Sequence, residues 1–123
     1  MQIRLASNID LQTLSHLFDL YRQSCEQLSD INGCYSFLSQ RLSENDSIIF
    51  VALEEEHLLG FIQLYPSFSS LMLQPVWFFD DAFVLPQYRN RGIASQMIAR
   101  ARVLAKSAQV ALVNRHIEQD LKV

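Results

Sequence analysis

The stretch FVLPQYRNRGIAS, residues 83–95, is the part of the sequence that decides the fold. It begins in an apolar run typical of a strand, and Pro86 ends that run because proline lacks the amide that a sheet ladder needs. After Gly92 the apolar residues recur at helical spacing. The start of a helix presents unpaired amides and the positive end of the backbone dipole. This strand-to-helix junction therefore suits an anionic phosphate group.

Four residues at the junction fit such a ligand. Gly92 has no β-carbon, so the backbone can turn sharply there and approach a ligand closely. Ala94 keeps the first helical turn open, and Arg89 and Arg91 add positive charge beside it. A P-loop needs GxxxxGK and a dinucleotide fingerprint needs GxGxxG, and this segment has neither. An ordinary helix start with solvated arginines remains the alternative.

Apolar periodicity divides the rest of the chain into a β-α-α-β-β-β-α-β order, which predicts one mixed α/β domain. Expected strands cover 2–6, 47–53, 58–65, 76–85 and 110–113, and expected helices run from Asn8 or Asp10 to Cys25, over 35–43 and over 92–108. Turns or loops are expected at 29–33, at the acidic 54–56 and at 66–75.

Composition narrows the function classes. The net charge of −3, from ten basic and thirteen acidic residues, argues against a nucleic-acid partner, which a basic excess would attract. The apolar runs are too short to span a bilayer and the N-terminus lacks a signal-peptide core, so we expect a soluble cytoplasmic protein with no membrane partner. The two cysteines and three histidines show no ligand spacing, so we expect reduced thiols and no metal.

Arg89, Gly92 and Ala94 resemble the signature of the GNAT superfamily of N-acetyltransferases. That signature is arginine or glutamine, two residues, glycine, one residue, then glycine or alanine, and the order of elements over 1–113 is similar as well. The resemblance implies a GNAT-like acyl-CoA N-acyltransferase fold, a mixed sheet flanked by helices, as a single domain over 1–123. It places the coenzyme A loop and helix at 84–108.

The resemblance also implies the cofactor contacts. Acetyl-CoA is the expected co-substrate, and an amine is expected to attack it directly without a covalent enzyme intermediate. The pantetheine arm would pair with main-chain groups near the end of the strand, those of Phe83, Val84 and Leu85. Backbone amides of the loop would hold the pyrophosphate, from Arg89, Asn90, Arg91, Gly92, Ile93, Ala94 and Ser95.

Asp80 and Asp81 are the candidate catalytic residues, because they are the ionisable residues of the strand over 76–85. Successive side chains of a strand point to opposite faces, so we expect at most one of them to face the substrate cleft. The resemblance puts a carboxylate at Asp80 in the general-base position of some members. The alternative, that the aspartates only bond to backbone or solvent, stays open. Trp77, Phe78 and Phe79 would enclose Asp80. Five aromatic residues either line an amine cleft or belong to the core: Tyr65, Trp77, Phe78, Phe79 and Phe83.

The C-terminal part departs from the family pattern. Members usually continue with another helix and two strands, and an asparagine is often followed by a tyrosine that protonates the leaving thiolate. This chain has Asn114 but no tyrosine after Tyr88. We expect a homodimer that covers the open sheet edge, with the C-terminal segment exchanged between subunits. Two functions remain: an acetyl-CoA-dependent N-acetyltransferase for a small-molecule or protein amine, or a truncated, catalytically weak relative that binds coenzyme A or serves as an oligomerising module.

Overall fold

The computed structural model describes residues 1–115 and 122–123. Its strands are β1 (Gln2–Leu5), β2 (Ile48–Glu54), β3 (His57–Ser69), β4 (Gln74–Val84) and β5 (Ala111–Asn114); its helices are α1 (Leu11–Ser24), α2 (Ile31–Glu44) and α3 (Ile93–Ser107), with 3-10 turns at Asn8–Asp10 and Pro86–Tyr88. The strands form one sheet in the order β1-β2-β3-β4-β5. All neighbours are antiparallel except β4 and β5, which are parallel. The predicted order of elements and the mixed α/β class are confirmed.

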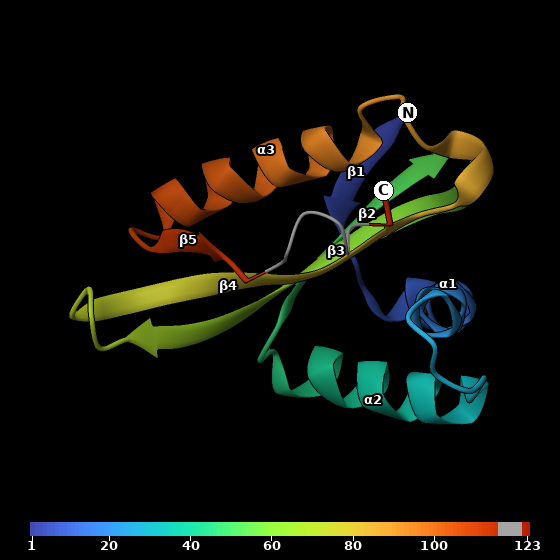
Figure 1. The fold of residues 1–123 in the computed structure, drawn as a ribbon, viewed down its shortest axis with the longest axis horizontal. Coiled ribbons are helices and arrows are strands. Elements are labelled where there is room, and N and C mark those ends of the chain that lie inside the picture. Colours follow the sequence, from blue (N-terminus) through green and yellow to red (C-terminus); the bar gives the residue numbers. More distant parts are fainter. Residues whose placement is uncertain (116–121) are drawn as a thin grey trace.

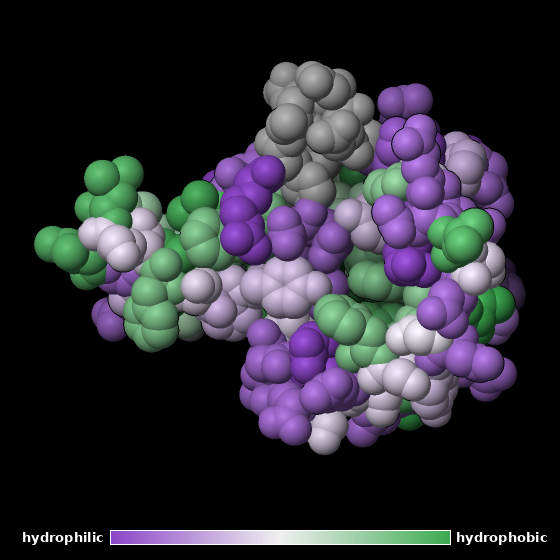
Figure 2. Space-filling view, turned by 60° about the horizontal axis from the view of Figure 1, so that its bottom comes forward, coloured by the Kyte–Doolittle hydropathy of each residue, from purple (hydrophilic) through white to green (hydrophobic). Residues whose placement is uncertain are grey.

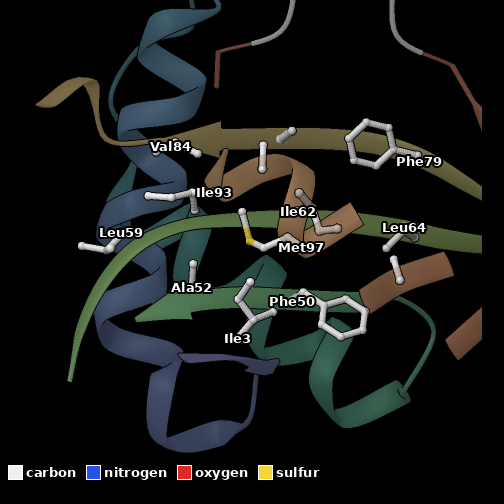
Figure 3. Close-up of a cluster of buried hydrophobic side chains, with 13 residues drawn as sticks. Ile3, Phe50, Ala52, Leu59, Ile62, Leu64, Phe79, Val84, Ile93 and Met97 are labelled. Carbon is white, nitrogen blue, oxygen red and sulfur yellow. The ribbon is translucent and has the colours of Figure 1, made fainter. Parts of the chain in front are cut away.

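The sheet is covered on both faces, by α3 on one side and by α1 and α2 on the other (Figure 1). On the α3 side, Phe50, Ile62 and Met97 meet in one cluster (Figure 3). The next residues along β2, Ile49 and Val51, belong to the cluster under α1 and α2. Because both faces are buried, β2 is apolar throughout rather than alternating. This burial fixes the register of the strands that carry the site.

Helix α2 begins earlier than the sequence predicted. Asp30 caps it, and its side chain accepts a hydrogen bond from the Gly33 amide at 2.9 Å. The turn predicted over 29–33 is therefore confirmed for Ser29 and Asp30 and wrong for 31–33, because Gly33 lies inside the first helical turn. A cap of this kind satisfies an amide that the helix start leaves free, and it outweighs the poor helix propensity of the residues that follow.

The loop predicted over 66–75 is also wrong, because these residues form the far end of the β3–β4 hairpin. Pro66 pairs with Trp77 at a point of β3 beyond its ladder with β2, and Pro75 pairs with Phe68 at a point of β4 before its ladder with β5, so each proline has a neighbouring strand on one side alone. A proline is tolerated at such a one-sided position since no second ladder needs its amide. The hairpin projects from the sheet (Figure 1), and hydrophobic surface gathers at its end (Figure 2).

Gly60 lies on β3 where it packs closely against the end of β4. A β-carbon at Gly60 would lie 2.6 Å from the carbonyl oxygen of Phe83 and 3.2 Å from the Cα of Val84. Backbone atoms cannot move aside without separating the strands. We therefore expect Gly60→Ala to lower the free energy of unfolding by about 1–3 kcal/mol, as overpacking does. Urea denaturation measures it, and an unchanged midpoint would contradict the close approach.

Candidate active site

The predicted coenzyme A loop has the backbone shape of an anion site. Asn90 and Gly92 both have a positive φ, 64° and 76°, and Gly92 is the N-cap of α3 without any side-chain cap. Within residues 1–115 and 122–123, the backbone amides of residues 90–95 donate no hydrogen bond. A β-carbon at Gly92 would meet nothing within 4 Å. The turn itself therefore favours glycine, and the space around it stays open for a ligand.

The two arginines of the loop have different partners. Arg89 turns back to the end of β4, where its Nε donates to the Val84 carbonyl at 2.7 Å and its guanidinium lies 5.2 Å from the Phe83 ring centre. Arg91 lies 5.4 Å from the Tyr88 ring centre. Arg89 is thus tied to the end of β4. Its hydrogen bond fixes the loop against β4.

The main-chain groups expected to pair with pantetheine are paired within the chain. Beyond Phe79, β4 and β5 are no longer paired with each other. There the Val84 amide donates to the carbonyl of Lys122 at 2.9 Å, and the Leu85 amide donates to Leu59 at 2.8 Å. The Lys122 carbonyl is thus the acceptor of the Val84 amide on this strand edge.

Both aspartates face two neighbouring hollows. The first, here the helix-side hollow, has a volume of about 420 Å³ and lies between α1, α2 and the strands β3 and β4. The second, the Lys122 hollow, has about 580 Å³ and lies beside the end of α1. Tyr21, Asp80 and Asp81 line both. These three residues therefore form the junction between the two hollows.

The prediction that only one aspartate faces the cleft is wrong because of a β-bulge. On β3, Gln63 pairs with Asp81, while the next residue, Leu64, pairs with Phe79. Asp80 is therefore the extra residue of the bulge. A bulge breaks the strict alternation of side chains and often re-aims one of them. Here it lets consecutive carboxylates line the same hollows.

Asp81 is held by two donors. The Tyr21 hydroxyl donates to its Oδ1 at 2.8 Å, and the Nε2 of Gln63 donates to its Oδ2 at 3.1 Å. Burial, and then the charge of Asp81, raise the pKa of the Tyr21 hydroxyl, and the same causes raise the pKa of Tyr65. Both tyrosines consequently stay protonated at neutral pH and serve as hydrogen-bond donors. Donors of this kind favour the ionised form of a carboxylate.

Asp80 is more accessible than the sequence suggested. Its side chain is 37 % exposed and contacts Arg115 at 3.3 Å, with the Arg115 guanidinium 4.1 Å from the Phe78 ring centre. The expected enclosure of Asp80 by strand aromatics is therefore wrong. Of the five aromatic residues considered for an amine cleft, only Tyr65 lines the helix-side hollow.

No pattern in the sequence marked several residues of the site as functional. Tyr21 follows the helical period of the buried face of α1, and it lies 60 residues from Asp81. Phe18 and Phe37 also line the helix-side hollow. Only the packing of α1 and α2 against the bulged strand brings these rings to the carboxylates.

Asp19 positions α2 against α1. It accepts hydrogen bonds from the Asp30 amide and the Ser29 hydroxyl, each at 2.7 Å, and the Asp30 amide is the main reason that the pKa of Asp19 is lowered. A lowered folded-state pKa stabilises the fold above the ordinary value of about 3.9, and that stability is lost as pH falls through the folded-state pKa. We expect Asp19→Asn to lower the free energy of unfolding at neutral pH. In the variant this free energy should also fall less steeply as the pH is lowered.

Urea denaturation between pH 2 and pH 7 measures this effect. Asp46→Asn is the matched control, because Asp46 is an exposed aspartate whose ion pair with Arg41, at 2.9 Å, does not join the two helices. Stability curves for Asp19→Asn and the wild type that run parallel down to acid pH would show that Asp19 does not hold α2.

Three other predictions concern a metal site, a membrane span and the C-terminal segment. Among the described residues, no three histidine, cysteine, aspartate or glutamate side chains are grouped so that they could hold a metal ion. In the same part of the chain, no helix is both long and apolar enough to cross a bilayer. The predicted exchange of the C-terminal segment falls largely on residues 116–121, outside the described residues, and it stays a prediction.

Comparison with known proteins identifies the family. The profile of the Acetyltransferase (GNAT) family matches residues 12–120. The chain is 36 % identical over 102 residues to "Uncharacterized N-acetyltransferase YhfO" of Bacillus subtilis, covering 83 % of this chain and 68 % of that protein. It is 35 % identical over 103 residues to a "Probable acetyltransferase" of Haemophilus influenzae, with 83 % and 70 % covered.

A solved structure agrees with this assignment. The crystal structure of a probable acetyltransferase superimposes with a TM-score of 0.88 at 35 % identity, and the match covers 95 % of this chain and 80 % of that one. The bulged strand, the loop with unpaired amides and the helix that follows it lie within the matched region of the family profile. The protein is therefore an N-acetyltransferase that belongs to the GNAT family of acetyltransferases.

Proposed function

We propose that the protein transfers an acetyl group from acetyl-CoA to an amine by direct attack of the amine on the thioester. The observation that carries this proposal is the junction of the two hollows at Tyr21, Asp80 and Asp81. A direct transfer needs two substrates held side by side and a base at their meeting point. In the proposed arrangement the acceptor lies in the helix-side hollow and the thioester reaches the junction from the Lys122 hollow.

The proposed coenzyme A contacts use main-chain groups. The free amides of residues 90–95 would hold the pyrophosphate, helped by the dipole of α3 and the charge of Arg91. The arm would run along Phe83, Val84 and Leu85, where the Val84 amide would exchange the Lys122 carbonyl for a pantetheine carbonyl. Acetyl-CoA supplies the activated acetyl group as a thioester.

Asp80 is the proposed general base. It lines both hollows, it is accessible to water and its only described ion pair is the 3.3 Å contact with Arg115. An acceptor that arrives as an ammonium would give one proton to Asp80, directly or through a water molecule, and its lone pair would then attack the thioester carbonyl. The C–S bond breaks, the nitrogen loses its second proton to water to give the neutral amide, and the thiolate takes a proton from solvent. Asp81, tied to Tyr21 and Gln63, is a positioning residue that keeps negative charge beside the amine.

Release of free thiol from acetyl-CoA tests the proposal. The purified protein is incubated with acetyl-CoA and a panel of amines, and thiol formation is compared with mass-spectrometric detection of the acetylated amine and with a sample that lacks amine. One thiol per acetylated product is expected. If calorimetry shows that acetyl-CoA binds and no amine of the panel is acetylated, the protein is instead a coenzyme A-binding module. Homodimerisation stays a prediction that light scattering at micromolar concentration tests.

A further inference from the structure

We propose that the helix-side hollow takes a monoamine carried on an aromatic body, the arylalkylamine class, in preference to polyamines and other polycations. This inference rests on the proposed function, which makes the hollow the acceptor site. Its volume of about 420 Å³ is in the range of small-molecule sites. The face that surrounds it mixes hydrophilic and hydrophobic surface (Figure 2).

The walls of the hollow are aromatic on three sides. Phe18 and Tyr21 come from α1, Phe37 from α2 and Tyr65 from β3. The rings of Phe18 and Phe37 are nearly parallel, with an interplanar angle of 23° and centroids 6.2 Å apart. Phe37 remains 39 % exposed, so part of its ring is available to a ligand. Aromatic faces of this kind favour offset stacking with a flat apolar group.

Gly33 lets the Asp30 carboxylate fold back against the start of α2. A β-carbon at this position would lie 2.3 Å from the Oδ2 of Asp30, so the capping carboxylate occupies the space where a side chain would otherwise stand. Asp30, Gly33, Cys34 and Phe37 follow one face of α2 over two turns, roughly 10 Å along its axis. The hollow is therefore extended along the helix, which suits a ring on a short chain.

The charges of the hollow suit a single ammonium. Asp80 and Asp81 stand together at the junction, and Arg115 offsets part of this charge from outside the hollow. Elsewhere in the lining, Arg22 and Asp30 carry opposite charges. Two carboxylates stand together at the junction alone, whereas Asp30 already accepts the Gly33 amide at 2.9 Å and shares the lining with Arg22, so a polycation would find one strongly anionic end for its ammonium groups. Desolvating an unpaired charge is unfavourable, and this disfavours polyamines.

Binding of 2-phenylethylamine to the full chain, measured by calorimetry without acetyl-CoA, tests the inference. We compare it with 2-phenylethanol, which lacks the charge, and with spermidine, which lacks the ring. The expected result is that 2-phenylethylamine binds at least ~10-fold more tightly than either, because only this probe can use both the aromatic walls and the carboxylates. Equal or tighter binding of spermidine, or no detectable binding of 2-phenylethylamine, would overturn the inference.

Variants of Phe37 connect the preference to this hollow. Phe37→Ala is expected to weaken the binding of 2-phenylethylamine at least ~10-fold with little effect on the binding of spermidine. Phe37→Tyr should keep the affinity for 2-phenylethylamine because it keeps the ring. Circular dichroism confirms the fold, and Phe37→Leu replaces Phe37→Ala if the latter unfolds. An unchanged affinity in the folded variant would overturn the inference. Failure of the proposed function looks different: the amine binds as expected, yet no thiol is released when acetyl-CoA is added.

Discussion

Asp80→Asn is expected to lower kcat/KM for acetyl transfer by about 10²–10⁴-fold, the contribution typical of a positioned general base. Asparagine keeps the size of the side chain but cannot take the proton that the ammonium must lose. The affinity for acetyl-CoA should stay unchanged, because the proposed cofactor contacts are main-chain groups of the loop and of the end of β4. Steady-state thiol release gives kcat/KM, and calorimetry gives the acetyl-CoA affinity.

Asp46→Asn is the matched control for Asp80→Asn. Asp46 is also a partly exposed aspartate with one arginine partner, Arg41 at 2.9 Å, and it lies in neither hollow. Its substitution should leave turnover near the wild-type value. If Asp80→Asn is as active as the wild type across pH while Asp81→Asn is inactive, the base is Asp81. Full activity of both variants would remove a carboxylate base from the mechanism.

The parts of the fold that follow from local sequence were predictable. The small and apolar residues Ala94, Met97 and Ala101 recur at helical spacing, and they form the buried face of α3. Gly92 after a proline-ended strand likewise marks the helix start, where the structure finds a positive φ. Such signals depend on a few consecutive residues, so a single sequence contains them.

The geometry of the catalytic junction could not be predicted because it depends on long-range pairing. A bulge is defined by the partner strand, and nothing in the residues around Asp80 shows that it lies opposite the step from Gln63 to Leu64. The contact between Tyr21 and Asp81 exists only once α1 packs on the sheet. The early start of α2 has the same origin, since Asp19 on another helix holds the amide of its capping residue.

Gly92→Asp is expected to weaken acetyl-CoA binding by about 100-fold without unfolding the protein. Two like charges about 4 Å apart repel by roughly 4 kcal/mol at an effective dielectric constant of 20, and partial exposure at the loop leaves about 2–3 kcal/mol of this. Aspartate tolerates a positive φ better than most residues, and negative charge at a helix N-terminus is itself stabilising. Calorimetry with acetyl-CoA, beside thermal unfolding, separates affinity from stability.

Gly92→Asn is the control that isolates charge from shape. Asparagine has nearly the same size as aspartate and shares its tolerance of the 76° φ at this position, and no neighbouring atom lies within 4 Å of the new β-carbon. Its effect on acetyl-CoA affinity should therefore be about 10-fold or less, and the difference between the two variants should shrink as salt is added, because ions screen exposed charges. Equal affinities for the aspartate and asparagine variants would mean that the pyrophosphate does not lie at the start of α3, since a carboxylate placed there could not fail to repel it.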